Sequence, residues 1–248
     1  MKRFFVACAW LALTGCATPL PQTPPAGVAA EVPAPRIQAG MQWTYRVRDG
    51  FTALPRPSEH YRVTEVAGDR VVVTVSRERI NDELEFYDRQ WNWLQHRATN
   101  LQPFVYSPPY PAFAFPLAAG RTWSARLMAT DPVTGQHFPL TVDGSVLGWE
   151  RVTVPAGEFD TLKVRRVVFL QYYESNVRGR SEIVETEWYA PALNMAVRRE
   201  ASARYLNFHA ESESGFVRVR GMGGDGGGGP RIVPDDWLIY ELTEYSAR

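Results

Sequence analysis

Apolar and polar residues alternate along most of the chain from Gly40 onward. Trp43, Tyr45 and Val47 alternate with threonine and arginine, a period of two that is typical of a strand with one buried face. In residues 161–173, alternate positions from Leu162 onward form a face that is almost wholly apolar. The other candidate strands are residues 60–77 (as a hairpin), 84–88, 91–96, 123–128, 138–142, 146–154, 181–189, 195–205 and 237–245.

Short turns separate these segments, so neighbouring strands are expected to pair antiparallel, because parallel pairs need long crossover connections. No amphipathic helix of useful length stands out. The pattern predicts an all-β fold with a single antiparallel sheet, strongly curved into a half-open barrel or a sandwich. Residues 103–120 contain five prolines among aromatic residues, which favours an irregular loop packed by its own rings.

The first residues do not follow the strand pattern. Lys2 and Arg3 precede an apolar run over residues 4–13. Because a helix needs roughly 20 apolar residues to cross a bilayer, this run is too short to be a spanning segment. Its length and charged start are typical of a secretory signal peptide.

The apolar run ends in the sequence Leu-Thr-Gly-Cys at residues 13–16, which resembles the bacterial lipobox. The resemblance implies cleavage before Cys16 and lipidation of this residue, whose thiol forms a thioether to a diacylglycerol that carries acyl chains such as palmitate. Ala17 stands where an aspartate would favour retention in the inner membrane. In a Gram-negative source we therefore expect an outer-membrane lipoprotein that faces the periplasm, with the membrane as its partner through the lipid anchor.

This address divides the chain into three parts. Residues 1–15 are the signal peptide, and residues 16–39 are the lipidated cysteine followed by a linker with six prolines. Such a linker is expected to be disordered or extended, and to act as a spacer. Residues 40–248 are the β-rich envelope domain. Since the chain has 2 cysteines, Cys8 and Cys16, the domain has no thiol for a disulfide or a metal.

Charge and motifs exclude several functions. Removal of Lys2 and Arg3 leaves 25 basic residues against 27 acidic ones, so the domain has no basic field for nucleic acid. The glycine-rich residues 221–230 lack the Lys-Ser/Thr of a phosphate-binding loop and are expected to form a flexible loop. No histidine pair has a metal-binding spacing, and no nucleophile motif is present. We therefore expect no catalysis, no cofactor and no metal.

Four charged residues fall on predicted strands in positions that matter for the core. Arg165 and Arg166 point to opposite faces of one strand, and Arg198 and Arg199 do the same on another. One member of each pair must therefore lie on the more apolar face, where an arginine needs a partner. Arg166 and Arg199 are predicted to point inward, with Glu185 or Glu187 as partner. These four residues are ion-pair positions or, alternatively, contacts for an anionic ligand.

Three segments together suggest a family. They are residues 115–123 (FPLAAGRTW), 150–164 (ERVTVPAGEFDTLKV) and 185–200 (ETEWYAPALNMAVRRE). In this order they resemble the DUF3108-like group of exported bacterial proteins, over roughly residues 110–205. The resemblance implies an envelope β-sheet domain and supplies no activity. One departure is Asn194, at a turn position where glycine is commonest in the family.

Three functions remain open. The first is a non-enzymatic lipoprotein whose curved sheet binds an apolar ligand, such as a lipid, or an envelope protein partner; the ligand form predicts a sizeable cavity lined by aromatic residues. The second is a structural accessory of an outer-membrane assembly, with a filled core. The third is a hydrolase of cell wall or polysaccharide, which would need a cleft with two carboxylates.

Overall fold

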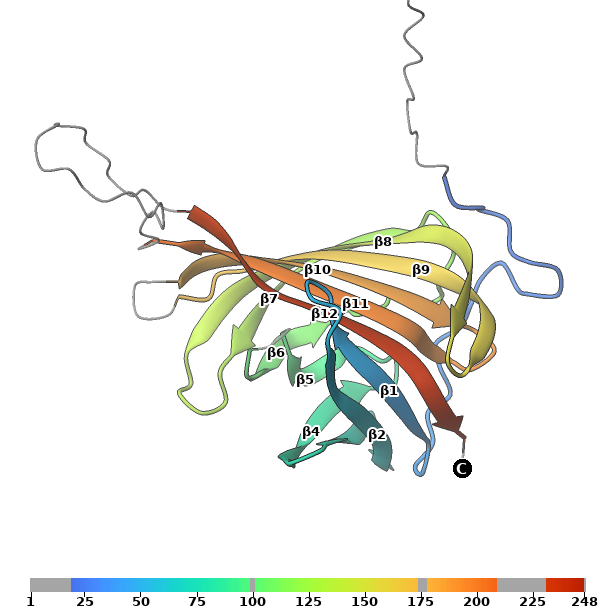
Figure 1. The fold of residues 1–248 in the computed structure, drawn as a ribbon, viewed down its shortest axis with the longest axis horizontal. Helices are drawn as coiled ribbons and strands as arrows, with labels where there is room; N and C mark the ends of the chain where they lie inside the picture. Colours follow the sequence, from blue (N-terminus) through green and yellow to red (C-terminus); the bar gives the residue numbers. More distant parts are fainter. Residues whose placement is uncertain (1–18, 99–100, 174–177, 209–230, 248) are drawn as a thin grey trace, which may run out of the picture.

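The part of the chain that the structure describes folds into twelve β-strands, which surround one interior (Figure 1). The structure is a computed structural model, and it describes residues 19–98, 101–173, 178–208 and 231–247. The strands are β1 (Gln42–Asp49), β2 (Pro55–Ala67), β3 (Arg70–Arg77), β4 (Ile80–Asp88), β5 (Trp93–Arg97), β6 (Pro103–Tyr110), β7 (Thr122–Thr130), β8 (His137–Val154), β9 (Gly157–Leu170), β10 (Arg178–Ala190), β11 (Met195–Asn207) and β12 (Arg231–Ser246).

Each strand pairs antiparallel with its neighbours in sequence, and β1 also pairs with β12. The predicted all-β, antiparallel, single-sheet fold is confirmed. The sheet closes into a barrel instead of staying half open, because β12 aligns with nearly all of β1. Pairing is shortest between β4 and β5 and between β6 and β7, with two and three aligned residue pairs. No helix in the described residues is long and apolar enough to cross a membrane.

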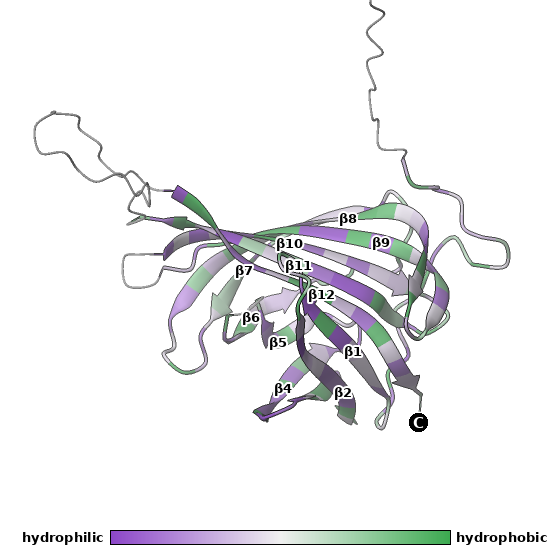
Figure 2. Cartoon of the chain, viewed as in Figure 1, coloured by the Kyte–Doolittle hydropathy of each residue, from purple (hydrophilic) through white to green (hydrophobic). Residues whose placement is uncertain are grey.

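Burial follows the alternation seen in the sequence. Along β10, Ile183, Glu185, Glu187 and Tyr189 are buried, while the residues between them are more exposed except near the end of the strand. Figure 2 shows the same alternation as apolar and polar bands along the strands. The buried face of β10 includes two glutamates, so the interior of the barrel is not purely apolar.

The segment expected to be a proline-rich loop is half strand and half loop. Residues 103–110 form β6, which corrects the prediction that prolines exclude a strand here. The reason is position: β6 pairs with β7 only through Val105, Tyr106 and Ser107, while Pro108 and Pro109 lie beyond that contact. Residues 111–119 do form a loop, which buries its aromatic and apolar side chains in one end of the barrel; we call it the plug loop.

The predicted segments 138–142 and 146–154 are one continuous strand, β8. The pairing register with β9 shifts between Val146 and Gly148, where the strand has a bulge. Gly148 has a φ of +138°, a conformation that side chains rarely adopt. The interruption in the sequence pattern therefore marks a bulge and not a turn.

The proline-rich segment before β1 differs from the free spacer that its composition predicts. Val32 forms an isolated antiparallel bridge with Leu117 of the plug loop, and both side chains are buried. Ile37 is also buried, and the carbonyl of Pro21 accepts a hydrogen bond from the Trp149 amide. Apolar side chains and free backbone groups between the prolines allow the segment to pack on the barrel. Cys16, the signal peptide and residues 221–230 lie outside the described residues.

Candidate functional site

The most unusual feature of the barrel is a charged group at its centre. The side chain of Arg166, on β9, is 1% exposed. Its Nε donates to Glu185 at 2.7 Å, its Nη2 donates to Glu187, and its Nη1 donates to the carbonyl of Ala112 in the plug loop at 2.7 Å. Tyr110 donates a further hydrogen bond to Glu185 at 2.8 Å. Each of the three nitrogens of this guanidinium therefore donates a hydrogen bond.

Glu187 links this centre to a second arginine. Arg199, on β11, lies beside Glu187 in the strand register, with 3.9 Å between Nε and Oε2. Burial by itself raises the pKa of Glu187, but the charges of Arg166 and Arg199 outweigh it and lower that pKa. Glu187 is thus held as a carboxylate inside the barrel.

Arg199 extends the network to β2, which lies three strands away from β11 in the closed sheet. Its Nη1 lies 3.5 Å from the hydroxyl of Tyr61 on β2, and that hydroxyl donates to Glu59 at 2.5 Å. Glu59 in turn pairs with Arg77 at 2.6 Å. The chain continues through Glu83, which accepts from Arg77 at 3.0 Å and from Arg97 at 2.7 Å. We call this chain the polar belt; its members are Arg166, Glu185, Glu187, Arg199, Tyr61, Glu59, Arg77, Glu83 and Arg97.

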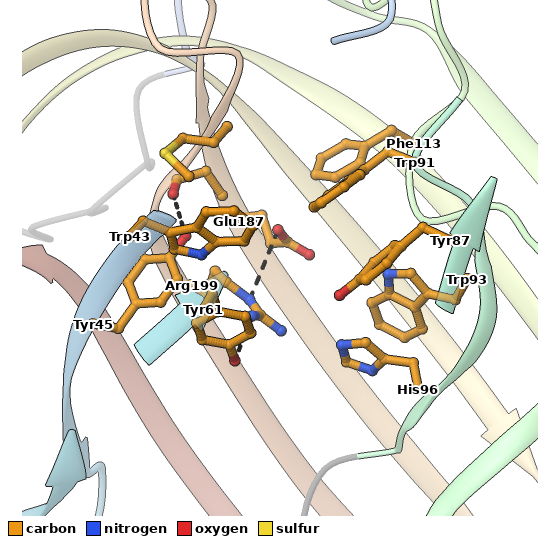
Figure 3. A pocket seen from close by; sticks show the side chains of 12 residues that line it. Trp43, Tyr45, Tyr61, Tyr87, Trp91, Trp93, His96, Phe113, Glu187 and Arg199 are labelled. Carbon is orange, nitrogen blue, oxygen red and sulfur yellow. Dashed lines mark hydrogen bonds and ion pairs between the residues drawn. The ribbon is translucent and has the colours of Figure 1, made fainter. Parts of the chain in front are cut away.

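Aromatic rings fill the space on both sides of the polar belt. Trp93 lies between the ring of Tyr110, with centroids 4.3 Å apart, and that of His96, with centroids 3.9 Å apart. Tyr87 stacks on Trp91 at 4.2 Å. Figure 3 shows the rings of Tyr87, Trp91, Trp93 and His96 on one side of the pocket, and Arg199 and Glu187 on the other. The rings place large, rigid apolar surfaces against the charged groups at the centre of the barrel.

The space left at this centre is about 30 Å³. It is lined by Trp43, Tyr45, Tyr61, Tyr87, Trp91, Trp93, His96, Phe113, Glu187, Met195, Ala196 and Arg199. That volume suits a water molecule, whereas sites for small ligands are ten times larger or more. The expected aromatic lining is present, but among the described residues the rings and the polar belt occupy this centre, and the sizeable cavity expected there is not found.

Larger hollows are open and lie at the rim or on the outside of the barrel. One of about 360 Å³ is lined by charged groups that include Glu59, Arg77 and Asp236. Another of about 520 Å³ lies over outward-facing residues of β7 and β8, such as Arg126 and Pro139. Neither offers an enclosed apolar surface for a lipid chain.

A buried glutamate and histidine share a proton beside the belt. Nδ1 of His96 lies 2.7 Å from the carbonyl of Arg97, so this nitrogen must donate. Nε2 of His96 lies 3.3 Å from Oε1 of Glu85, whose other oxygen accepts from Tyr87 at 2.5 Å. A neutral histidine with its proton on Nδ1 has no donor on Nε2, so one further proton must lie between the two groups.

Burial decides where that proton resides. It raises the pKa of Glu85 to about 7, although the hydrogen bond from Tyr87 lowers it. Burial and the charge of Arg199 lower the pKa of His96 to about 4. The proton therefore stays on Glu85, which donates it to a neutral His96.

The structure brings together the four charged residues that the sequence singles out. Arg166 contacts both Glu185 and Glu187, and Arg199 lies next to Glu187. Sequence reasoning missed the second half of the polar belt and the pair of Glu85 and His96. The alternation around Glu59 and Glu85 could have indicated inward positions, but the residues next to them along the two strands gave no face that was clearly apolar.

The remaining titratable groups do not form a metal site. In the described ranges, no group of three or more His, Cys, Asp or Glu residues is arranged to hold a metal ion. His60 and His137 each contact a threonine hydroxyl on the barrel exterior, at 3.0 and 2.9 Å. His209 lies outside the described residues.

Comparison with known proteins gives a fold likeness only. No family model matches the sequence, so the resemblance to the DUF3108-like group stays a prediction. No curated protein matches it either.

Three solved structures are similar in shape. A protein of Parabacteroides distasonis described as a lipoprotein has 16% identity and a TM-score of 0.46, over 92% of this chain and 97% of that one. A Bacteroides fragilis exported protein with a YmcC-like fold has 16% identity and a TM-score of 0.46, over 87% and 99%. The hypothetical lipoprotein YmcC of Escherichia coli has 10% identity and a TM-score of 0.37, over 83% and 85%.

The shared proton gives a test through pH. In folded protein Glu85 keeps a proton that it loses above about pH 4.5 when unfolded, so its contribution to stability falls as pH rises toward 7. The contribution of His96 to stability rises with pH over this range, because its pKa falls from 6.5 to about 4 on folding. The changes in the free energy of unfolding with pH that come from Glu85 and from His96 therefore cancel between about pH 4.5 and 6.5. The variant Glu85→Gln keeps the hydrogen bonds and removes the pH-dependent contribution of Glu85. The free energy of unfolding of this variant relative to wild type should therefore rise by about 1.4 kcal/mol per pH unit.

The measurement is the free energy of unfolding in denaturant at pH 5.0 and 6.5. The difference between Glu85→Gln and wild type should grow by about 2 kcal/mol between these pH values. Glu65→Gln, at an exposed position of β2, serves as the control and should show no such change. An equal difference at both pH values for Glu85→Gln would exclude the shared proton.

Proposed function

We propose that this chain is an envelope lipoprotein that acts as a non-enzymatic binding or assembly module through the outside of its barrel. Cys16 is its acylated first residue after cleavage, and in a Gram-negative source it is held at the outer membrane facing the periplasm. Its partner is another envelope protein. Of the functions that the sequence leaves open, this is the structural accessory rather than the carrier of an apolar ligand.

One observation supports this choice more than any other: the interior is filled. The central space of about 30 Å³ is far too small for a lipid chain, and its polar wall groups pair with one another. A carrier would need an enclosed apolar space of several hundred Å³. The same network disfavours the hydrolase alternative, because Glu185 and Glu187, which share a face, are both occupied by Arg166.

The exterior offers what a protein partner needs. Phe51 and Ile232 are 57% and 61% exposed, and both line an open hollow of about 510 Å³ whose other walls include Arg165 and Glu182. Apolar groups surrounded by charged ones are typical of interaction surfaces. The lipobox would place the protein at the membrane, and this surface would bind the protein partner.

The address is tested by Cys16→Ser. Without the thiol no thioether to a lipid can form, so the variant should move from the membrane fraction to the soluble periplasmic fraction and should not incorporate an alkynyl palmitate label. Cys8→Ser, within the apolar run, is the matched control and should stay acylated and membrane-bound. A Cys16→Ser protein that still floats with membranes would overturn the assignment.

The choice between accessory and carrier is tested by what the native protein brings with it. Protein purified from its own membranes should release, on organic extraction, no molecule in a one-to-one ratio other than bulk phospholipid. A second lipoprotein purified in parallel from the same membranes gives the background for mass spectrometry. A single apolar compound enriched to stoichiometric amounts would favour the carrier instead.

A further inference from the structure

The segment between the acylation site and β1 is fixed to one end of the barrel. The backbone amide of Trp149 donates to the carbonyl of Pro21 at 2.8 Å. The side-chain amide of Gln22 donates to the carbonyl of Leu147 at 2.9 Å. These contacts hold residues 20–22 against the bulge in β8.

The bulge is shaped for this contact. A Cβ at position 148 would lie 2.7 Å from the carbonyl oxygen of Pro21 and 2.8 Å from the Cβ of Leu20. Both approaches are closer than side chains tolerate. Only glycine at position 148 leaves room for the segment, and its positive φ turns the β8 backbone to meet it.

A second contact lies further along the same segment. Val32 and Leu117 exchange two backbone hydrogen bonds of 2.8 and 2.7 Å, and both side chains are buried. Leu117 belongs to the plug loop, and the carbonyl of Ala112 in the same loop accepts from Arg166. The segment is therefore attached both to the wall of the barrel and to the loop that closes its end. Figure 1 shows the segment beside the ends of β8 and β9.

The length of chain before the first contact limits the position of the anchor. Leu20 is four positions after Cys16, and an extended chain spans at most 3.3–3.6 Å per residue, or about 14 Å here. A linker free over its whole length up to β1 would reach several times farther. The docked segment thus leaves little chain between the lipid and the barrel.

We infer that the plugged end of the barrel, with the β8 bulge and the β10–β11 turn, faces the membrane surface at close range. The inference rests on the proposed acylation of Cys16. The partner of this end is a phospholipid headgroup surface, while the β7–β8 turn at the opposite end projects away from it. The outer hollow lined by Phe51 and Ile232 then remains accessible to a protein partner.

Two label positions distinguish the ends of the barrel. Ala192 is exposed in the β10–β11 turn, near Tyr189. Tyr189 pairs with Leu162 of β9, which in turn pairs with Trp149 of β8, so this turn lies at the height of the bulge. Val133 is 89% exposed in the β7–β8 turn. The part of β8 between the β7–β8 turn and Trp149 is about 40 Å long. At the usual strand tilt, this separates the two labels by about 30 Å along the barrel axis. Single Ala192→Cys and Val133→Cys variants can be labelled specifically, since the predicted mature domain has no other free thiol.

The experiment uses acylated full-length protein in phosphatidylethanolamine–phosphatidylglycerol vesicles with rhodamine on a fraction of the headgroups. Energy transfer from a donor dye at position 192 should be at least twofold more efficient than from position 133. A twelve-residue Gly-Ser insertion after Pro19 lengthens the free tether without touching the contacts and should remove the difference. The same insertion between Ala29 and Ala30, which are exposed between the two contacts, should preserve it.

Equal transfer from both positions in protein that floats with the vesicles would overturn the inference, as would stronger transfer from position 133. Protein that fails to float would instead contradict the proposed acylation. Gly148→Leu adds an independent variant: by occupying the space of Pro21 it should release the segment and reduce the difference. If that variant does not fold, the two insertions still decide the question.

Discussion

A buried guanidinium between two carboxylates is the constraint on which the barrel depends. Taking Arg166 out of water has a large desolvation cost, which is offset only if its charge is paired and each of its three nitrogens finds a well-placed partner. Glu185, Glu187 and the carbonyl of Ala112 meet that requirement from two different parts of the chain. The position of the plug loop relative to β9 and β10 is thereby fixed by hydrogen-bond geometry as well as by apolar packing.

The polar belt extends this constraint across the interior. Arg199 and Tyr61 connect β11 to β2 through the middle of the barrel, and Arg77 continues the chain to β3 and β4. A closed sheet of twelve strands is wide enough to leave an open interior. Large rings and paired charges fill it here, which explains why only about 30 Å³ remains and why the surface rather than the interior is the place for a partner.

Much of this fold could be predicted from the sequence because a strand has a strict period of two. The alternation from Trp43 and along residues 161–173 gave the strands and their inward faces. It also placed Arg166 on the inner face, since its neighbours at two-residue spacing are valines. The sequence indicated that glutamates on the neighbouring strand would pair with these arginines, but not which glutamate contacts which arginine. The strand register that sets Glu187 beside Arg199 is a property of the closed sheet.

Other features required the three-dimensional fold. Glu85 and His96 are eleven positions apart on short strands with irregular pairing, so no spacing rule connects them. The docking of Pro21 depends on a bulge at Gly148, and composition alone reads the same residues as a free spacer. In each case the deciding contact joins segments far apart in sequence, where a local pattern carries no information.

The central claim is that Arg166 and its two carboxylates stabilise the barrel only as a complete set. The most direct measurement compares the free energy of unfolding of wild type, Arg166→Met, and the triple variant Arg166→Met, Glu185→Gln, Glu187→Gln. Removal of the arginine alone leaves Glu185 without a counter-charge and Glu187 with Arg199 alone, at 3.9 Å, and should cost about 3–5 kcal/mol. The triple variant removes all three charges of the set and leaves Arg199, whose side chain is 20% exposed, with the hydroxyl of Tyr61 as its partner; it should recover at least half of that loss. An Arg166→Met protein as stable as wild type, or a triple variant no more stable than the single one, would contradict the account.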